Sequence, residues 1–168
     1  MYELPYIHRL KSVVLRQWLI NMQRAEQLRP LSRQHHLGLN LGLKAGQFPM
    51  SSSEADIKDQ WQKITAFIRD ELTSHFGVEE DYLVKPLMTY HKDNPQVIEL
   101  SEQLTAQHEE LKRLADKANP TIEDLRDLGD ALYEHIRFEE REVFPLAQEL
   151  LTSEQLDAIY TQSGDDVK

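Results

Sequence analysis

The stretch that decides the fold is HFGVEEDYLVKPL (residues 75–87), because a second stretch, HIRFEEREVFPL (residues 135–146), repeats its order. Both read His-x-x-x-Glu-Glu, then an apolar turn, then Pro-Leu, with the proline one residue nearer in the second copy. On a helix, residues four apart lie on one face. Each copy therefore presents an imidazole and a carboxylate to a common point: His75 with Glu79, and His135 with Glu139.

Further histidines stand in helical patterns elsewhere in the chain. His108 lies among leucines at helical spacing, so we expect it to face inward. Nearer the N-terminus, two histidines are adjacent. His36 aligns with Leu39 and Leu43, whereas His35 shares a face with Leu39 and otherwise with glycines. The leucines favour His36 as the inward residue, and His35 is the alternative.

Apolar residues at helical spacing run through the rest of the chain, and strand signals are almost absent. The predicted helix starts are Ser32, Ser53 with Asp56 in capping-box position, Asn94-Pro95, and Thr152 for a short last helix. A further break falls at residues 119–121. These signals predict an all-α fold, an antiparallel up-down four-helix bundle with an extra N-terminal helix or arm and a short C-terminal helix.

Three parts follow from these boundaries. We expect an N-terminal helix or arm over residues 1–30, the bundle over residues 31–151, and a short helix with a frayed tail over residues 152–168. The first connection is uneven, because the stretch from Ser53 to His75 is much longer than that from His36 to Phe48. Either the second helix overhangs the first, or its first turns belong to a loop.

Composition excludes several functional classes. The 168 residues include 29 acidic and 19 basic side chains, a formal net charge of −10, which argues against a nucleic-acid partner. The lack of cysteine excludes disulfides, thiolate metal sites and iron–sulfur clusters. No apolar run is long enough for a membrane helix, and the N-terminus does not read as a signal peptide. We therefore expect a cytoplasmic protein with no membrane partner.

The two copies carry the same donors in the same order, which indicates a metal site. Imidazole nitrogen and carboxylate oxygen together suit iron, manganese or zinc. A buried carboxylate without a partner is costly, so two glutamates at matched core positions need a cation or an ion-pair partner. The alternative is that Glu79 and Glu139 lie at the boundary of the core and pair with Arg or Lys. Six such positions on four helices favour the metal site.

The chain resembles the hemerythrin-like (HHE cation-binding) domain family over about residues 31–151. The resemblance rests on the His-x-x-x-Glu-Glu phrases with their Pro-Leu tails and on the single histidines of the first and third helices. It implies two non-heme iron ions bridged by carboxylates and an oxo or hydroxo oxygen, although zinc or manganese would also suit. The implied ligands are His36 (or His35), His75, Glu79, His108, His135 and Glu139.

Two positions depart from the oxygen-carrying hemerythrins. These proteins have a second histidine four residues after the third-helix histidine, where this chain has Lys112. They also have an Asp five residues after the fourth-helix histidine, where this chain has Glu140, so a ligand shift from Glu139 to Glu140 is an alternative. One missing ligand leaves an open coordination position.

The resemblance implies a protein that binds a small diatomic ligand, O2 or NO, as a sensor, buffer or detoxifier, rather than an enzyme. The alternatives are a di-iron enzyme that reduces peroxide or oxidises ferrous iron, and a metal-stabilised interaction module. Ferritin-like oxidases use Glu-x-x-His and more carboxylates. The histidine-rich donor set of this chain favours ligand binding over oxygen activation.

Overall fold

The computed structural model describes residues 24–164, which form helices and no strand. The first helical stretch comprises a 3-10 turn, η1 (Glu26–Leu28), and α2 (Arg29–Gly46). The second stretch runs through α3 (Glu54–Phe67), η2 (Ile68–Leu72), α4 (Thr73–Glu79), η3 (Glu80–Val84) and α5 (Lys85–Tyr90). The third is α6 (Pro95–Ala115), and the fourth runs through α7 (Ile122–Phe138), η4 (Glu139–Val143) and α8 (Phe144–Leu150). A short helix, α9 (Ser153–Gln162), follows.

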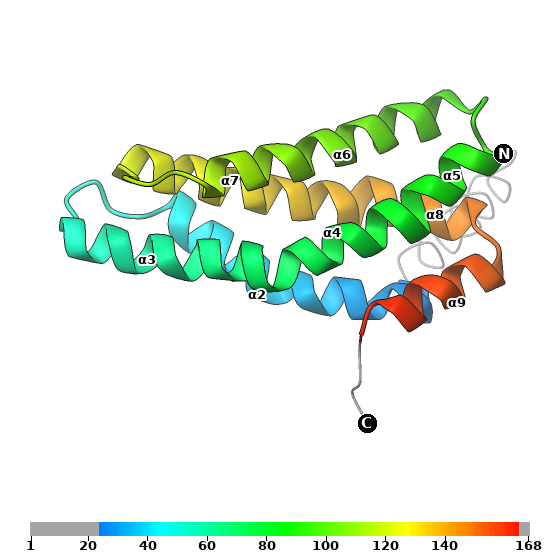
Figure 1. Cartoon of the computed structure of the whole chain (residues 1–168), viewed down its shortest axis with the longest axis horizontal. Coiled ribbons are helices and arrows are strands. Elements are labelled where there is room, and N and C mark those ends of the chain that lie inside the picture. Colours follow the sequence, from blue (N-terminus) through cyan, green and yellow to red (C-terminus); the bar gives the residue numbers. More distant parts are fainter. Residues whose placement is uncertain (1–23, 165–168) are drawn as a thin grey trace, which may run out of the picture.

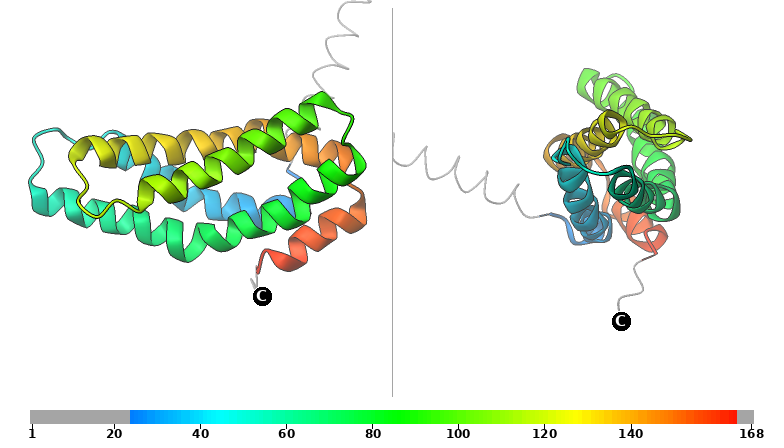
Figure 2. Two further views of the ribbon diagram at one scale, coloured as in Figure 1. Left: turned by 45° about the horizontal axis from the view of Figure 1, so that its top comes forward. Right: turned by 90° about the vertical axis from the view of Figure 1, so that its left-hand side faces the viewer.

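The four long stretches lie along one axis and form a helical bundle (Figure 1). Viewed end-on, they surround a shared interior (Figure 2). α9 packs against η1 and η3 at one end of the bundle. At the other end α3 begins beyond the end of α2, so the second stretch overhangs the first (Figure 1). None of the described helices is both long and apolar enough to cross a membrane.

Side-chain caps explain where most of the helices begin. Ser53 accepts a hydrogen bond from the backbone N–H of Asp56, and Asn94 caps α6 with Pro95 in the first turn. Thr152 forms a capping box at the start of α9. These predicted starts are confirmed.

The predicted start at Ser32 is wrong. α2 begins three residues earlier, at Arg29, and Pro30 occupies its first turn. Proline is well suited to that position, because the first N–H groups of a helix have no intrahelical partner. The rest of the predicted N-terminal helix or arm, and the end of the predicted tail, lie outside the described residues.

Two of the three described π-helical segments begin at a glutamate of the repeated phrase. η3 begins at Glu80 and η4 at Glu139, and each begins six residues before its proline, Pro86 or Pro145. The one-residue offset of the prolines is therefore matched by the offset of the π segments. A proline in a helix removes a backbone donor, and the wider π turn accommodates that loss without ending the helix.

Glycines bring α2 and α7 into close contact. Gly38, Gly42 and Gly46 recur at every fourth residue of α2. A Cβ atom on Gly42 would lie 2.9 Å from the carbonyl oxygen of Gly129, and a Cβ atom on Gly129 would lie 2.4 Å from the backbone nitrogen of Gly46. Only glycine allows this approach of the two backbones. The glycine face of α2, and not its leucine face, therefore points into the bundle.

The apolar core is divided into two clusters along the bundle axis. One cluster includes Leu31, Leu83, Leu104 and Val143, and the other includes Leu72, Leu111 and Ile136. Each long stretch thus contributes to both clusters. The buried histidines lie where the two clusters meet, and they are His35, His75, His108 and His135.

Candidate metal centre

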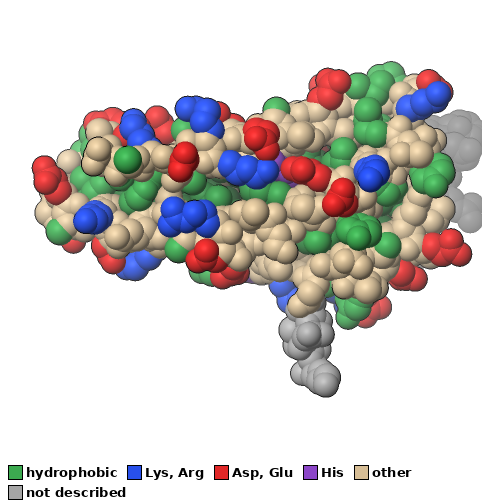
Figure 3. Space-filling model, in the orientation of Figure 1, with side chains coloured by type: hydrophobic (Ala, Val, Ile, Leu, Met, Phe, Trp, Pro, Cys, Tyr) green, Lys and Arg blue, Asp and Glu red, His purple; other side chains and the backbone are tan. Residues whose placement is uncertain are grey.

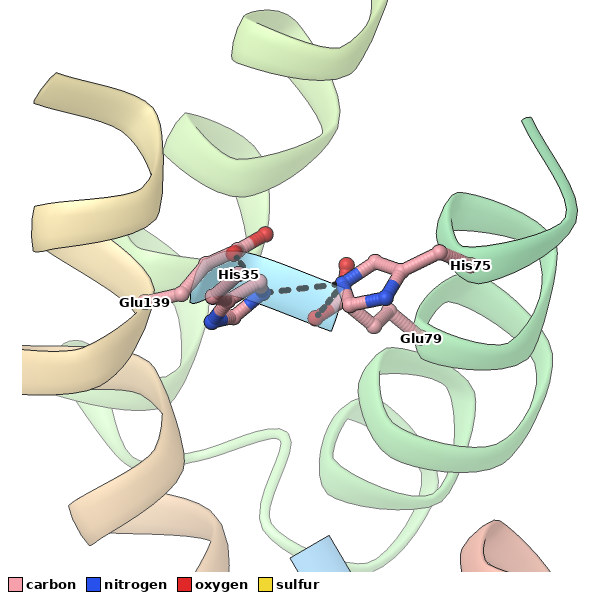
Figure 4. Close-up of side chains that lie close together, drawn as sticks. All are labelled: His35, His75, Glu79 and Glu139. Carbon is pink, nitrogen blue, oxygen red and sulfur yellow. Dashed lines mark hydrogen bonds and ion pairs between the residues drawn. The ribbon is translucent and has the colours of Figure 1, made fainter. Parts of the chain in front are cut away.

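Six side chains from four helical stretches meet in the buried interior. All six are at most 2% exposed, and we call them the cage: His35, His75, Glu79, His108, His135 and Glu139. Figure 4 shows four of them, with the ring of His35 between Glu139 and the His75–Glu79 pair. On the face shown in Figure 3, acidic and basic side chains are interspersed, and histidine shows only as a small area.

The structure brings together every predicted donor except His36, which is exposed. The inward prediction for His36 is wrong because α2 packs through its glycines. His35 lies on that glycine face, whereas the leucines that favoured His36 are partly solvent-accessible, with Leu43 46% exposed.

Each cage carboxylate spans two groups of imidazoles. Oε1 of Glu79 lies 3.2 Å from Nε2 of His75, and Oε2 lies 3.2 Å from Nε2 of His108. Oε2 of Glu139 lies 2.9 Å from Nε2 of His35, and Oε1 lies 2.8 Å from Nε2 of His135. The cage therefore has two halves, one with His35 and His75 and one with His108 and His135, joined by both carboxylates.

The ligand atoms of each half are close enough to surround one cation. In the first half, donor atoms of His35, His75, Glu79 and Glu139 lie within 4.8 Å of one another. In the second half, the same holds for His108, His135 and Glu139.

Every cage imidazole has a hydrogen-bond acceptor at its outer nitrogen. Each acceptor is adjacent in sequence to a cage residue and accepts from the cage histidine of the next helical stretch. The acceptor on the fourth stretch accepts from the histidine of the first. The Nδ1 contacts are His75 with Gln34 (2.6 Å), His108 with Glu80 (2.8 Å), His135 with Gln107 (3.0 Å) and His35 with Glu140 (2.7 Å). With Nδ1–H donating outward, an Nε2 atom that carries no proton would offer its lone pair to a cation inside the cage.

Two phenylalanines cover the cage from opposite halves. The ring of Phe76 stacks on His108, with centroids 4.0 Å apart, and the ring of Phe144 stacks on His35, with centroids 5.5 Å apart. Both phenylalanines are buried. The rings therefore hold the two imidazoles in place and exclude water from their faces.

Several inward-facing polar atoms have no hydrogen-bond partner among the described residues. They include both oxygens of Glu79, both oxygens of Glu139, and Nε2 of His108 and His135. The ion pairs of Glu79 and Glu139 within residues 24–164 are with histidines, which excludes the predicted alternative of Arg or Lys partners there. Buried carboxylates in this state need positive charge, and nitrogen and oxygen donors of this kind fit a transition-metal cation.

The electrostatics of the cage also favour positive charge. Burial alone would lower the pKa of His35, but the negative charge of the adjacent Glu139 carboxylate outweighs it and raises the pKa to about 10. At His108, burial likewise lowers the pKa, but the nearby carboxylates of Glu139 and Glu79 outweigh it and raise the pKa to about 10. Although burial favours the neutral acid, the surrounding imidazoles hold the pKa of Glu139 well below its usual range.

Three of the four acceptors at the Nδ1 atoms of the cage histidines were not predicted, and the fourth was predicted in a different role. Gln34, Glu80 and Gln107 were not singled out, and Glu140 was considered as a substitute for Glu139. The structure places Glu139 inside the cage and Glu140 outside it, against Nδ1 of His35. The sequence feature that could have identified them is their position next to a cage residue. Gln precedes two cage histidines, and Glu follows both cage glutamates.

The fold and the cage together define a helical-bundle protein with a buried histidine–carboxylate site suited to metal cations. The family model for the hemerythrin HHE cation binding domain matches residues 26–147, and the chain belongs to this family. The match begins five residues before the predicted bundle and so includes η1. No curated protein and no solved structure matches the chain.

Proposed function

We propose that this chain is a non-heme di-iron protein of the hemerythrin type that binds O2 or NO for sensing, buffering or detoxification. In this proposal the four long stretches are the antiparallel four-helix bundle of that type. The six cage residues are its iron ligands, with His35 as the ligand of the first helix.

The observation that carries the proposal is the division of both carboxylates between two groups of imidazoles. A site for a single cation would gather its donors at one point. Here Glu79 and Glu139 each direct one oxygen to each half. This geometry supports two cations bridged by both carboxylates.

Each half supplies two imidazoles and carboxylate oxygens, a donor set that suits non-heme iron with open coordination positions. Lys112, one turn after His108, adds no donor: its ammonium contacts Glu109 at 2.8 Å and lies 5.9 Å from the ring centroid of Phe76. Iron held by these residues would supply the coordination positions at which O2 or NO binds.

The chain's own residues restrict what can reach the cage. Phe76 and Phe144 lie against its imidazoles, and apolar clusters close it at both ends along the bundle axis. A small, weakly polar ligand crosses such packing more readily than a larger or charged molecule. This enclosure supports a diatomic ligand over an extended substrate.

The test is anaerobic loading of the metal-free chain with Fe²⁺, followed by optical spectroscopy on exposure to O2 or NO. We expect two iron ions per chain and a spectral change that reverses when the gas is removed. His91→Ala is the matched control, because His91 contacts the backbone oxygen of Leu150 outside the cage.

Two results would contradict the proposal. A chain that takes up zinc but no iron, and whose stability is lost to a chelator, would be a metal-stabilised interaction module. An iron-loaded chain that turns over hydrogen peroxide or ferrous iron would be an enzyme instead.

A further inference from the structure

A residue outside the four long stretches contacts side chains that support the cage. Arg24, just before η1, donates hydrogen bonds to the backbone oxygen of Glu140 (2.8 Å) and to Oε1 of Gln148 (3.0 Å), and it forms an ion pair with the Glu140 carboxylate. The backbone N–H of Ala25 also donates to Gln148 (3.0 Å). The Arg24 side chain is only 18% exposed. This segment is therefore anchored against η4 and α8.

Arg24 touches both groups that orient His35. Glu140 uses Oε1 to accept from Nδ1 of His35 and Oε2 to contact Arg24. The guanidinium also lies 4.8 Å from the ring centroid of Phe144, whose ring stacks on His35 at an interplanar angle of 12°. Arg24 therefore contacts both the hydrogen-bond acceptor of His35 and the phenylalanine ring that stacks on it.

The other half of the cage has the same parts without this connection. Glu80 accepts from Nδ1 of His108, and Phe76 stacks on the ring of His108. The cation over Phe76 is Lys112, at 5.9 Å, and it pairs with Glu109. Among residues 24–164 no lysine or arginine pairs with Glu80, which is 37% exposed, compared with 28% for Glu140.

We propose that Arg24 is a positioning residue of the metal centre: it holds Glu140 and Phe144 against His35, so that the His35–His75 half binds its cation more tightly than the His108–His135 half. A ligand that is already held in its binding orientation loses less freedom when the metal arrives. The four converging donors of the first half, against three in the second, agree with this order. The inference rests on the proposed two-cation centre, but not on iron, O2 or NO.

Zinc provides the first test, because it binds the same donors without redox chemistry. Zinc should leave the loaded full chain in two steps on titration with a chelator. Arg24→Gln should weaken the tighter step by about tenfold, at the low end of the effect of a residue that holds a ligand. Arg24→Lys should restore part of the loss. Arg113→Gln, which removes an exposed arginine paired with Glu110, is the control and should change neither step.

A site-specific readout separates positioning from a general loss of stability. In nitrogen-15-labelled, zinc-loaded protein, the Nδ1–H protons of the cage histidines report solvent exchange individually. Arg24→Gln should speed exchange at His35 and leave exchange at His108 unchanged. An unchanged His35 proton, equal acceleration at both histidines, or two equal zinc steps in the unaltered chain would each overturn the proposal.

Arg24→Gln could fail to fold, and a milder variant then carries the test. Gln148→Ala removes one partner of Arg24 without touching the Glu140 pair, so the same site-selective changes should appear at smaller size. If they do not, the anchoring of Arg24 does not tighten the His35–His75 half, and the proposal is overturned. A chain that binds no zinc would contradict the proposed function itself, whereas two zinc ions with unaltered steps in these variants would contradict only the role of Arg24.

Discussion

The two copies of the His-x-x-x-Glu-Glu phrase, residues 75–80 and 135–140, contribute the same donors to the cage but differ in how they are supported. In the first copy Glu80 is partly exposed and contacts His108. In the second, Glu140 contacts His35 and is also held by Arg24. The repeated phrase thus specifies the donors, and residues outside it make the two halves unequal.

The largest effect should come from the carboxylates that join the halves. Glu139→Ala should abolish binding of both cations, because each half loses an oxygen and His35 and His135 lose their counter-charge. Glu79→Ala should also lower the count, by at least one. Metal analysis after desalting measures both, with Glu142→Ala, an exposed carboxylate on η4, as the control. Two cations retained in either cage variant would show that the carboxylates do not bridge.

A smaller loss of bound metal should distinguish the two adjacent histidines of α2. His35→Ala should remove the cation of the first half and leave the second occupied, because His35 is buried with its Nε2 toward Glu139. His36→Ala should leave the count unchanged, because His36 is exposed. Zinc analysis of the two variants in parallel decides which histidine is the ligand. The reverse pattern would restore the leucine-based prediction.

The metal affinity of the two halves should depend on pH in the same way. Each contains one histidine with a pKa of about 10, His35 or His108, which must release a proton when metal binds. Affinity in each half should therefore rise about hundredfold from pH 7 to pH 9. Without metal, the stability of the fold should change with pH in the opposite direction. Protonated His35 and His108 stabilise the fold fully below the unfolded pKa of about 6.5, and this stabilisation is lost as pH rises toward 10. Chelator-buffered zinc titrations and thermal unfolding in a chelator measure the two trends.

A flat affinity profile would show that the two raised pKa values are not coupled to metal binding. A steep rise in only one half would break the expected similarity between them.

The smallest effects should come from the outer carboxylates, taken one half at a time. Glu140→Gln should weaken only the His35–His75 half, and Glu80→Gln only the His108–His135 half, each by about tenfold. The amide keeps the acceptor oxygen but removes the charge that strengthens the imidazole as a ligand. Two-step zinc titrations would show which step moves, and equal changes in both steps would contradict independent support.

Much of the fold could be predicted from local signals. Ser53, Asn94 and Thr152 are short-range caps, and their partners lie within three residues, so sequence alone identifies them. Pro30 is the last residue of the predicted N-terminal helix or arm, but in the structure it belongs to the first turn of α2, since proline fits both roles. The π segments were not predicted, although η3 and η4 each begin six residues before a proline.

The donor set of the site could be predicted, but its orientation and support could not. Spacing of four residues is enough to pair His75 with Glu79. The choice of His35 required knowing that α2 packs by backbone contact at Gly42, which no count of leucines reveals. The outer acceptors depend on the order of helices around the bundle, and Arg24 lies far from Glu140 in the sequence.

The most direct test of the account is a crystal structure of the zinc-loaded chain with anomalous differences recorded at the zinc edge. We expect two peaks, one between His35 and His75 and one between His108 and His135, with the carboxylates of Glu79 and Glu139 between them. A single peak at the centre of the six side chains, or peaks only outside them, would contradict it.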